Sequence, residues 1–167
     1  MTLYDTVVST YSLIHLISLS VTDLVPITPD RFLFAFQKTL NSILVNTYKD
    51  LLMDPKATGL AWFHGLLASE AVIQTPLLIM ILLQKNTKIT CLSKYKDLIH
   101  LVYGCHVATT MIPTLSHLIF GTDLQSNEIL VLLSMYLPFA LIPAWMVIKN
   151  VHNIMLVLDK STIKKTI

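Results

Sequence analysis

Charged residues are scarce in this sequence: they make up only 13% of its 167 residues, whereas 54% are hydrophobic. A soluble domain of this length needs a charged shell around its core, so the composition excludes an ordinary water-soluble fold. The net charge of +2 is small, and the lysines lie beside apolar runs without forming a basic stripe. We therefore expect no nucleic-acid partner.

Cysteine is equally rare. The two cysteines, Cys91 and Cys105, lie in a lysine-rich loop and inside an apolar run. Such a pair excludes a disulfide framework, and no spacing typical of a zinc site accompanies it. We therefore expect neither a disulfide, nor a metal site, nor a cofactor.

What the sequence does contain is long apolar runs. Four windows each fit a helix of about 20 residues that crosses the hydrocarbon core of a bilayer. They are residues 7–25, 61–83, 98–120 and 129–148. The first window lacks a basic leader and a small-residue cleavage site, which favours a retained span over a signal peptide. The predicted fold class is an all-α integral membrane protein with a bundle of four transmembrane helices.

The placement of lysine predicts the topology. Of the twelve Lys and Arg residues, two groups of four lie between the second and third windows and after the fourth. They are Lys85, Lys88, Lys94 and Lys96, and Lys149, Lys160, Lys164 and Lys165. The positive-inside rule assigns both groups to the cytosol, so we expect both termini there.

The chain ends in Lys164-Lys165-Thr166-Ile167, which matches the dilysine pattern for retrieval to the endoplasmic reticulum. The alternative is a basic tail that interacts with anionic headgroups. We expect a multi-pass protein of the endoplasmic reticulum membrane, with one domain over residues 1–160 and a cytosolic tail with the retrieval signal over residues 161–167.

The connection between the first two windows has a helical pattern of its own. Within residues 30–51 the apolar residues recur at helical spacing, at Leu33, Phe36, Leu40, Ile43, Leu44 and Leu51. This predicts an amphipathic helix on the lumenal side. It either lies on the lumenal membrane surface or caps the bundle, and a surface helix without any ligand role fits equally well.

Two acidic residues fall inside the predicted spans. Asp23 lies near the lumenal end of the first span, and Glu70 lies about nine residues into the second. An ionisable group in hydrocarbon costs at least about 2.5 kcal/mol, so it usually faces the bundle and has a function.

Other polar residues share helix faces with these acids. Gln74 follows Glu70 by one turn, His106 and Thr110 share a face of the third span, and Tyr136 lies in the lumenal half of the fourth. If these faces converge, they line a cavity suited to an amphiphile that carries a hydroxyl or an amine. Hydrogen bonds that only hold the helices together are the alternative, which we favour for Gln74 and Thr110 taken singly.

Two carboxyl groups close together in a dry site do not both stay ionised. We therefore expect one of Asp23 and Glu70 to be protonated and hydrogen-bonded to the other. The pair then holds a single negative charge, which a protonated amine would neutralise. Asp54 either supplies a further carboxylate from the loop or, with Pro55, marks a turn or helix cap; the sequence alone favours the turn.

Several short segments are specific when taken together in their order and spacing. They are Thr22-Asp23-Leu24, Asp54-Pro55, Ala61-Trp62-Phe63 leading to Glu70, Gln74-Thr75-Pro76, His106 with Thr109-Thr110-Met111-Ile112-Pro113, Tyr136-Leu137-Pro138 and Leu141-Ile142-Pro143. With this set the chain resembles the sigma-2 receptor (transmembrane protein 97) family, within the EXPERA group that includes the emopamil-binding sterol isomerases. It differs from the mammalian pattern at Phe139, where a tyrosine is usual.

The resemblance implies a four-helix fold in the endoplasmic reticulum, a homodimer, and a ligand pocket that opens towards the membrane. Carried over by position, Asp23 would pair with a ligand amine, Glu70 would be its protonated partner, and Asp54 would be a second essential acid. Gln74, Thr110 and Tyr136 would line the pocket, and His106 joins the candidates through its place on the polar face of the third span.

Three classes of function follow. The leading hypothesis is a non-enzymatic protein that binds a sterol or a cationic amphiphile and acts in sterol handling or trafficking. The enzymatic alternative is a sterol delta8-delta7 isomerase, but the isomerases carry a His-x-x-x-Glu pair, whereas here His106 is followed four residues later by Thr110. The third is a membrane chaperone or scaffold in protein targeting or quality control, with an incidental cavity.

Overall fold

The computed structural model of this chain is built from helices. It describes the backbone of residues 2–84 and 90–166 and the side chains of residues 2–84 and 92–160; within this part there is no β-strand. The elements in chain order are α1 (Leu3–Ser18), η1 (Leu19–Asp23), η2 (Val25–Ile27), η3 (Asp30–Phe32), α2 (Ala35–Asn46), η4 (Leu51–Met53), α3 (Ala61–Ser69), η5 (Glu70–Gln74), α4 (Thr75–Leu83), α5 (Thr90–Lys94), α6 (Lys96–Phe120) and α7 (Ser126–Thr166).

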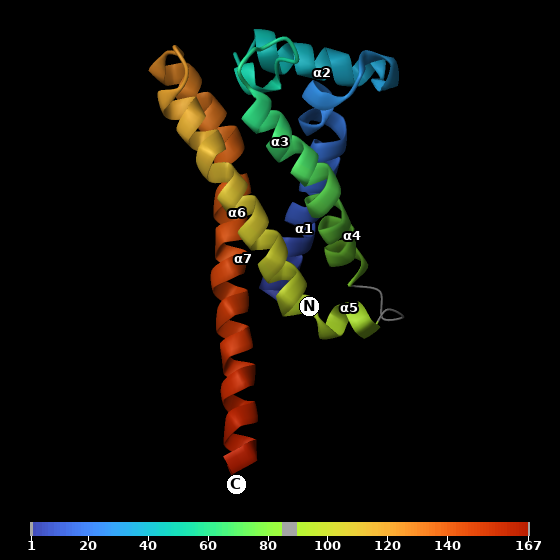
Figure 1. Ribbon diagram of the computed structural model, residues 1–167, viewed down its shortest axis with the longest axis vertical. Helices are drawn as coiled ribbons and strands as arrows, with labels where there is room; N and C mark the ends of the chain where they lie inside the picture. The colour runs from blue at the N-terminus through green and yellow to red at the C-terminus, as the bar shows by residue number, and fades with distance from the viewer. Residues whose placement is uncertain (1, 85–89, 167) are drawn as a thin grey trace.

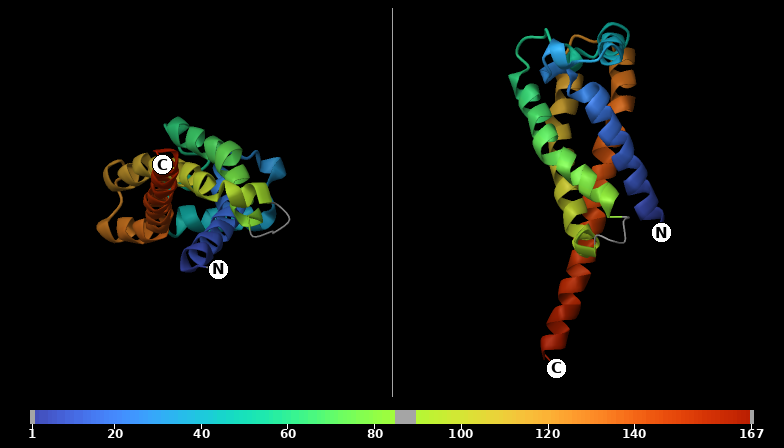
Figure 2. Two further views of the ribbon diagram at one scale, coloured as in Figure 1. Left: turned by 90° about the horizontal axis from the view of Figure 1, so that it is seen from below. Right: turned by 90° about the vertical axis from the view of Figure 1, so that its right-hand side faces the viewer.

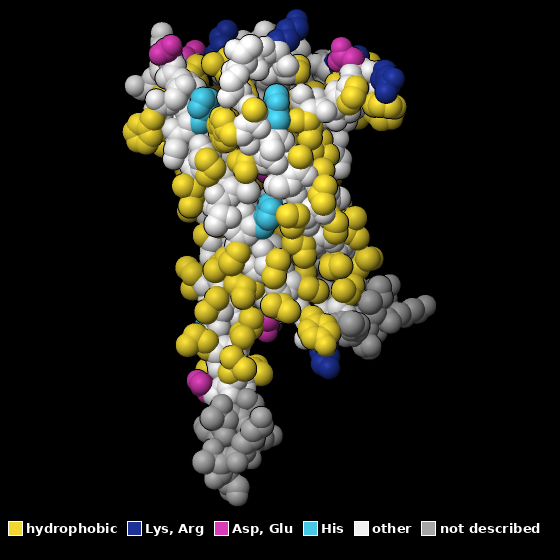
Figure 3. Space-filling model, viewed as in Figure 1, with side chains coloured by type: hydrophobic (Ala, Val, Ile, Leu, Met, Phe, Trp, Pro, Cys, Tyr) yellow, Lys and Arg dark blue, Asp and Glu magenta, His cyan; other side chains and the backbone are white. Residues whose placement is uncertain are grey.

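Four helical segments among the described residues are long and apolar enough to cross a membrane: Leu3–Ile27, Ala61–Leu83, Lys96–Phe120 and Ser126–Lys160. They confirm the four predicted spans and the all-α membrane fold class. Figure 3 shows hydrophobic side chains along the flank of the bundle and charged side chains gathered towards its two ends, as expected where the flank meets lipid.

The fourth span is longer than the predicted window of residues 129–148. Helix α7 continues without a break to Thr166, through most of the predicted tail, and projects beyond the other helices (Figure 1). Pro138 and Pro143 lie inside it without ending it. A membrane span tolerates proline where neighbouring helices satisfy the freed backbone groups.

The helices pack mainly as two pairs. Helices α6 and α7 lie side by side over much of their length, and α1 packs against α4 (Figures 1 and 2). Gly104 permits the close approach of α6 to α7, because a Cβ atom there would lie 2.9 Å from the carbonyl oxygen of Pro143. Both termini lie towards one end of the bundle, and α2 crosses the opposite end.

The predicted amphipathic helix over residues 30–51 is present but shorter. Helix α2 covers only Ala35–Asn46, because Phe34 has an extended backbone and Lys49 has a positive φ of 60°. The short 3-10 helices η3 and η4 flank it. These interruptions let the segment turn at both ends, so that α2 lies across the bundle instead of extending the first span.

Buried apolar side chains form two clusters at different depths. The cluster nearer the termini includes Tyr103, Val107 and Met111, and the cluster nearer α2 includes Phe63 and Leu67. The two meet around Tyr136, whose ring packs against both. The space between them is where the candidate site lies.

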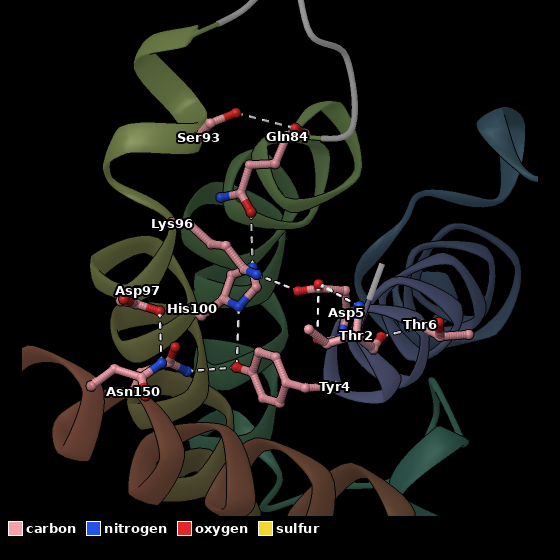
Figure 4. Close-up of polar contacts among 11 residues, drawn as sticks. Thr2, Tyr4, Asp5, Thr6, Gln84, Ser93, Lys96, Asp97, His100 and Asn150 are labelled. Carbon is pink, nitrogen blue, oxygen red and sulfur yellow. Dashed lines mark hydrogen bonds and ion pairs between the residues drawn. The ribbon is translucent and has the colours of Figure 1, made fainter.

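A polar network joins four helices at the termini end (Figure 4). Asn150 Nδ2 donates to the Tyr4 hydroxyl at 2.6 Å, and this hydroxyl lies 3.1 Å from His100 Nδ1. His100 Nε2 lies 2.9 Å from the Gln84 side-chain oxygen. These contacts connect α1, α4, α6 and α7 through hydrogen bonds, which are an effective link between helices in a membrane.

Candidate functional site

A cavity of about 280 Å³ lies between the four spans and under α2. Eight of its lining residues are apolar and eight carry polar or ionisable side chains, a mixture suited to a ligand with both kinds of group. Its lining residues are His15, Ser18, Thr22, Asp23, Leu44, Asp50, Met53, Phe63, Leu67, Glu70, Val107, Met111, Thr114, Met135, Tyr136 and Phe139.

Asp23 faces this cavity from a π-helical turn at the end of the first span. The turn runs over Leu19–Asp23, and the Leu24 N–H bonds to the carbonyl of Leu19 instead of that of Ser20. The Asp23 carboxylate accepts hydrogen bonds from Thr22 Oγ1 at 2.7 Å and from Ser18 Oγ at 3.0 and 3.1 Å. Two hydroxyl donors thus hold the carboxylate in place while it borders the cavity.

Glu70 also starts a π-helical turn, η5, in the second span. Pro76 follows this turn and has no N–H for an α-helical bond, which accounts for a local change of register. The Glu70 carboxyl borders the cavity and interacts electrostatically with Asp23. The expected hydrogen bond between the two acids is not among the hydrogen bonds of the described residues, since Asp23 is bonded by Ser18 and Thr22 instead.

Gln74 is fully buried beside Glu70 but is not among the described residues that line the cavity. No hydrogen bond of good geometry reaches either end of its amide. Its predicted place one turn from Glu70 is right, and the register of the π-helical turn directs it into the helix packing instead of the cavity.

A third carboxyl group in the cavity wall is Asp50, which the sequence did not single out. It is 2% exposed, and Tyr136 donates its hydroxyl to one carboxylate oxygen at 2.8 Å while the Leu52 N–H reaches the other at 3.2 Å. Burial raises the pKa of Asp50 to about 6, although these hydrogen bonds act in the opposite direction. The sequence signal for it was its place as the N-cap before two buried residues, Leu52 and Met53.

Asp54, the acid carried over from the resemblance, does not line the cavity. Its side chain accepts a hydrogen bond from the Lys56 N–H at 2.9 Å, and its carbonyl accepts one from the Ala57 N–H at 3.0 Å. These bonds form a turn, which is the reading that the Asp-Pro pair favoured. Asp50, not the Asp54 that the resemblance implied, is thus the loop carboxyl group in the cavity wall: η4 lies between the two residues, and only Asp50 borders the cavity.

On α6 the cavity is bordered by Val107, Met111 and Thr114. This face differs from the predicted polar face of His106 and Thr110, neither of which is among the cavity-lining residues. Successive residues on a helix are about 100° apart, so a shift of one position turns a residue away. The Thr110 hydroxyl bonds to the Val107 carbonyl at 3.0 Å, a contact within its own helix.

His15 borders the cavity from the first span, where the sequence marked only its polarity. Its Nδ1 lies 2.5 Å from the hydroxyl of Tyr103 and 3.3 Å from that of Tyr11. The Tyr103 hydroxyl also donates to that of Tyr11 at 3.5 Å, so the donor and acceptor roles at Nδ1 depend on the tautomer of the ring. No described residue bonds to the second ring nitrogen, Nε2, which is therefore open to a partner beside the cavity.

Tyr136 and the two C-terminal lysines complete the set of predicted residues. Tyr136 lines the cavity as predicted and contacts Asp50. The side chains of Lys164 and Lys165, the predicted retrieval signal, lie outside the described residues. Among those that are described, no group of His, Cys, Asp or Glu is arranged to hold a metal ion.

The arrangement is suited to binding an amphiphile. Asp23, Glu70 and Asp50 gather carboxyl groups in a cavity that also has apolar lining residues, and Tyr136 and His15 add neutral polar groups. A ligand amine would find an acidic partner, and an apolar skeleton would contact Phe63, Leu67 and other walls.

Comparison with known proteins identifies the family of the chain. The model of the EXPERA (EXPanded EBP superfamily) family matches residues 35–150. Sigma intracellular receptor 2 of Xenopus tropicalis is 33% identical over 104 residues, an alignment that covers 58% of this chain and 57% of the relative. The aligned part is thus less than two thirds of the relative's length. Because the family model spans most of the chain, from α2 to the middle of α7, this protein belongs to the EXPERA family.

Proposed function

We propose that this protein binds a sterol or a cationic amphiphile in the cavity between its spans, without catalysis, and acts in sterol handling or trafficking. The observation that carries the proposal is the convergence of Asp23, Glu70 and Asp50 on one partly apolar cavity. Acidic groups inside a membrane bundle are costly, so their common direction favours a ligand over chance.

Charge pairing would favour a cationic ligand. A carboxylate at Asp23 is desolvated but held by two hydroxyl donors, so it is ready to accept an ammonium group. The pair would gain from low local dielectric, since both charges are then neutralised where water is sparse. An uncharged sterol would use its hydroxyl with His15 or Tyr136 and its rings with the apolar walls.

The placement of aromatic and histidine residues supports binding rather than isomerisation. An isomerase needs an acid, a base and a carbocation-stabilising aromatic around the substrate. The candidates for these roles are Glu70, Asp23 and His106, with Trp145 as the aromatic residue. Glu70 and Asp23 line the cavity, but His106 and Trp145 are not among the described cavity-lining residues. The Trp145 ring instead packs edge-on against Tyr4 at 5.1 Å, near the termini. The relative's name as a receptor agrees with a binding role.

The cellular setting is part of the same proposal. Both termini lie towards one end of the bundle, which fits cytosolic termini and a dilysine signal read in the cytosol. We place the protein in the endoplasmic reticulum membrane as a homodimer. Replacing Lys164 and Lys165 with serine would remove the retrieval signal, so the protein should leave the endoplasmic reticulum. Cross-linking in intact membranes would detect the dimer.

The binding proposal is tested with a radiolabelled cationic amphiphile and a photoreactive sterol. Purified wild type should bind the amphiphile saturably, and the sterol should compete with it, because both use one cavity. Asp23→Asn and Glu70→Gln should weaken the binding of the amphiphile. If both variants bind as well as wild type, the acidic cavity is not the site. Conversion of a delta8 sterol by the purified protein would replace the non-enzymatic proposal with an isomerase.

A further inference from the structure

Helix α2 attaches to the bundle through a polar side. Gln37 Nε2 donates to the carbonyl oxygen of Ser20 at 2.9 Å, within the π-helical turn that leads to Asp23. Asn41 is the buried residue of α2, only 7% exposed, and Leu44 beside it borders the cavity. The inward side of α2 therefore combines the amides of Gln37 and Asn41 with Leu44 and Val45, which pack against the apolar cluster of Phe63 and Leu67.

The neighbouring side of α2 is apolar and exposed. Five residues form this apolar ridge: two phenylalanines that precede the helix and three residues at helical spacing within it. They are Phe32 (62% exposed), Phe34 (67%), Phe36 (53%), Leu40 (39%) and Ile43 (42%). The rings of Phe34 and Phe36 stack on each other with centroids 5.9 Å apart, so the ridge is a continuous surface.

The third side of α2 is polar and exposed, with Lys38, Thr39, Ser42 and Asn46. At about 100° per residue, these positions and the apolar ridge occupy different sectors of the helix. The helix thus has three sectors: one faces the bundle, one is apolar and exposed, and one is polar and exposed.

This distribution differs from that in a water-soluble helix, which buries most of its large apolar residues: Phe36, Leu40 and Ile43 are exposed, whereas Asn41 is buried. Helix α2 also lies across the end of the spans (Figure 1), at the level where the apolar flank of the bundle ends (Figure 3). Cationic side chains lie above hydrophobic ones at this end (Figure 3), and the Arg31 guanidinium lies 4.8 Å from the centre of the Phe32 ring. Basic and aromatic residues side by side are typical of the headgroup region.

We propose that the apolar ridge of α2 inserts into the outer part of the leaflet distal to the two termini, with lipid acyl chains as its partner. The helix then lies in the plane of the interface, with the Thr39 and Ser42 side in water. Since Leu44 on its inward side borders the cavity, the leaflet holds one wall of the cavity in place.

Spin labels test the insertion without any ligand. In a background with Cys91 and Cys105 replaced by alanine, single cysteines at Phe36 and Leu40 carry a nitroxide, and Thr39 and Ser42 serve as matched controls on the same helix. The protein is reconstituted in lipid nanodiscs, which leave both membrane faces accessible. Power saturation then compares the access of oxygen, which concentrates in lipid, with that of a water-soluble nickel chelate.

We expect the ratio of oxygen access to nickel access to be severalfold higher at Phe36 and Leu40 than at Thr39 and Ser42. Equal ratios at all four positions, with ready access to nickel, would overturn the proposal and place the ridge in water. Low access to both reagents at Phe36 and Leu40 would overturn it too, because a protein surface would then cover the ridge. All four positions are exposed, so labelling should leave the fold intact; circular dichroism checks this. A protein that binds no amphiphile would still give a clear result.

Discussion

The bundle holds two polar regions that differ in what their groups bond to. Near the termini, hydrogen bonds run in one consistent direction: Asn150 donates to Tyr4, Tyr4 to His100 Nδ1, and His100 Nε2–H to Gln84. Lys96 forms an ion pair with Asp5 beside these hydrogen bonds (Figure 4). Protein groups are thus bonded to protein groups from four helices.

Around the cavity, similar residue types are arranged differently. Asp23 is held by Ser18 and Thr22 from its own span. The carboxyl group of Glu70 has no hydrogen bond of good geometry among the described residues, although its carbonyl accepts one from Thr75. No described residue bonds to Nε2 of His15.

Near the termini, Asn150 Oδ1 and Gln84 Nε2 also lack a partner among the described residues, but they are buried in the helix packing. Asp23, Glu70 and His15 border a cavity, so a ligand can reach them. The comparison therefore separates polar residues that join helices from polar residues that bind.

The largest expected effect is a difference in ligand affinity between substitutions of two aspartates, one in each region. Asp23→Asn removes the charge that pairs with a ligand amine, and breaking a buried ion pair costs about 3 to 5 kcal/mol, more than about a hundredfold in Kd. Asp97→Asn is the matched control, because Asp97 accepts a hydrogen bond from Asn153 near the termini. It should change Kd less than about threefold. Saturation binding of a labelled cationic amphiphile measures both.

A similar loss of affinity in both variants would show that the charge acts through the fold and would remove the distinction between the regions. Circular dichroism of the two variants checks that each keeps its helix content.

Asp50 should make stability depend on pH. Burial raises its pKa from 3.8 to about 6, so the folded protein binds this proton more tightly than the unfolded chain. Stability should therefore fall as pH rises from about 4 to about 6, by about 3 kcal/mol from this group alone, and stay level above that range. Asp50→Asn should remove this part of the pH dependence. The difference between the unfolding curves of wild type and variant, measured from pH 4 to 8, isolates the group.

Tyr136→Phe sharpens the same test. Its hydroxyl donates to Asp50 at 2.8 Å and favours the carboxylate, so its loss should raise the pKa of Asp50 further. The pH range over which stability falls should then extend upward. A range that stays in place would show that this hydrogen bond does not act on the charged form.

In the region near the termini the expected effect is on stability, not on binding. Asn150 is fully buried, and Asn150→Ala removes the hydrogen bond that its side chain donates to the Tyr4 hydroxyl. Leaving a buried group without its partner costs about 1 to 3 kcal/mol. The midpoint of thermal unfolding should fall, whereas the Kd for an amphiphile should stay unchanged once binding is measured well below that midpoint. A large change in Kd would mean that the network acts on the cavity.

The sequence predicts the spans well because each apolar run is long enough to cross a bilayer, whatever its neighbours do. It also predicts Asp23, Glu70 and Tyr136, because a polar group in a membrane helix must face protein. These three residues are placed by an energetic rule that acts on each helix separately.

The residues that the sequence misplaces depend on backbone geometry that no local pattern specifies. The π-helical turn at Glu70 changes the register of Gln74, and the turn at Lys49 with its positive φ directs Asp50, not Asp54, into the cavity. Thr110 and Thr114 are both polar residues of one helix, and only the rotation of α6 against the bundle decides which borders the cavity.

The rotation of α6 can be tested by substitution, and the change expected in ligand affinity is the smallest of these effects. Thr114→Leu places a larger side chain in the cavity wall, and overpacking costs typically 1 kcal/mol or more, so the affinity for an amphiphile should fall about fivefold. Thr110→Leu makes the same change one turn away, at a position that is not among the described cavity-lining residues, and should leave the affinity within about twofold of wild type. The order would be reversed if α6 presented the face of His106 and Thr110 to the ligand. Titration of both variants in the same lipid therefore tests which face of α6 borders the site.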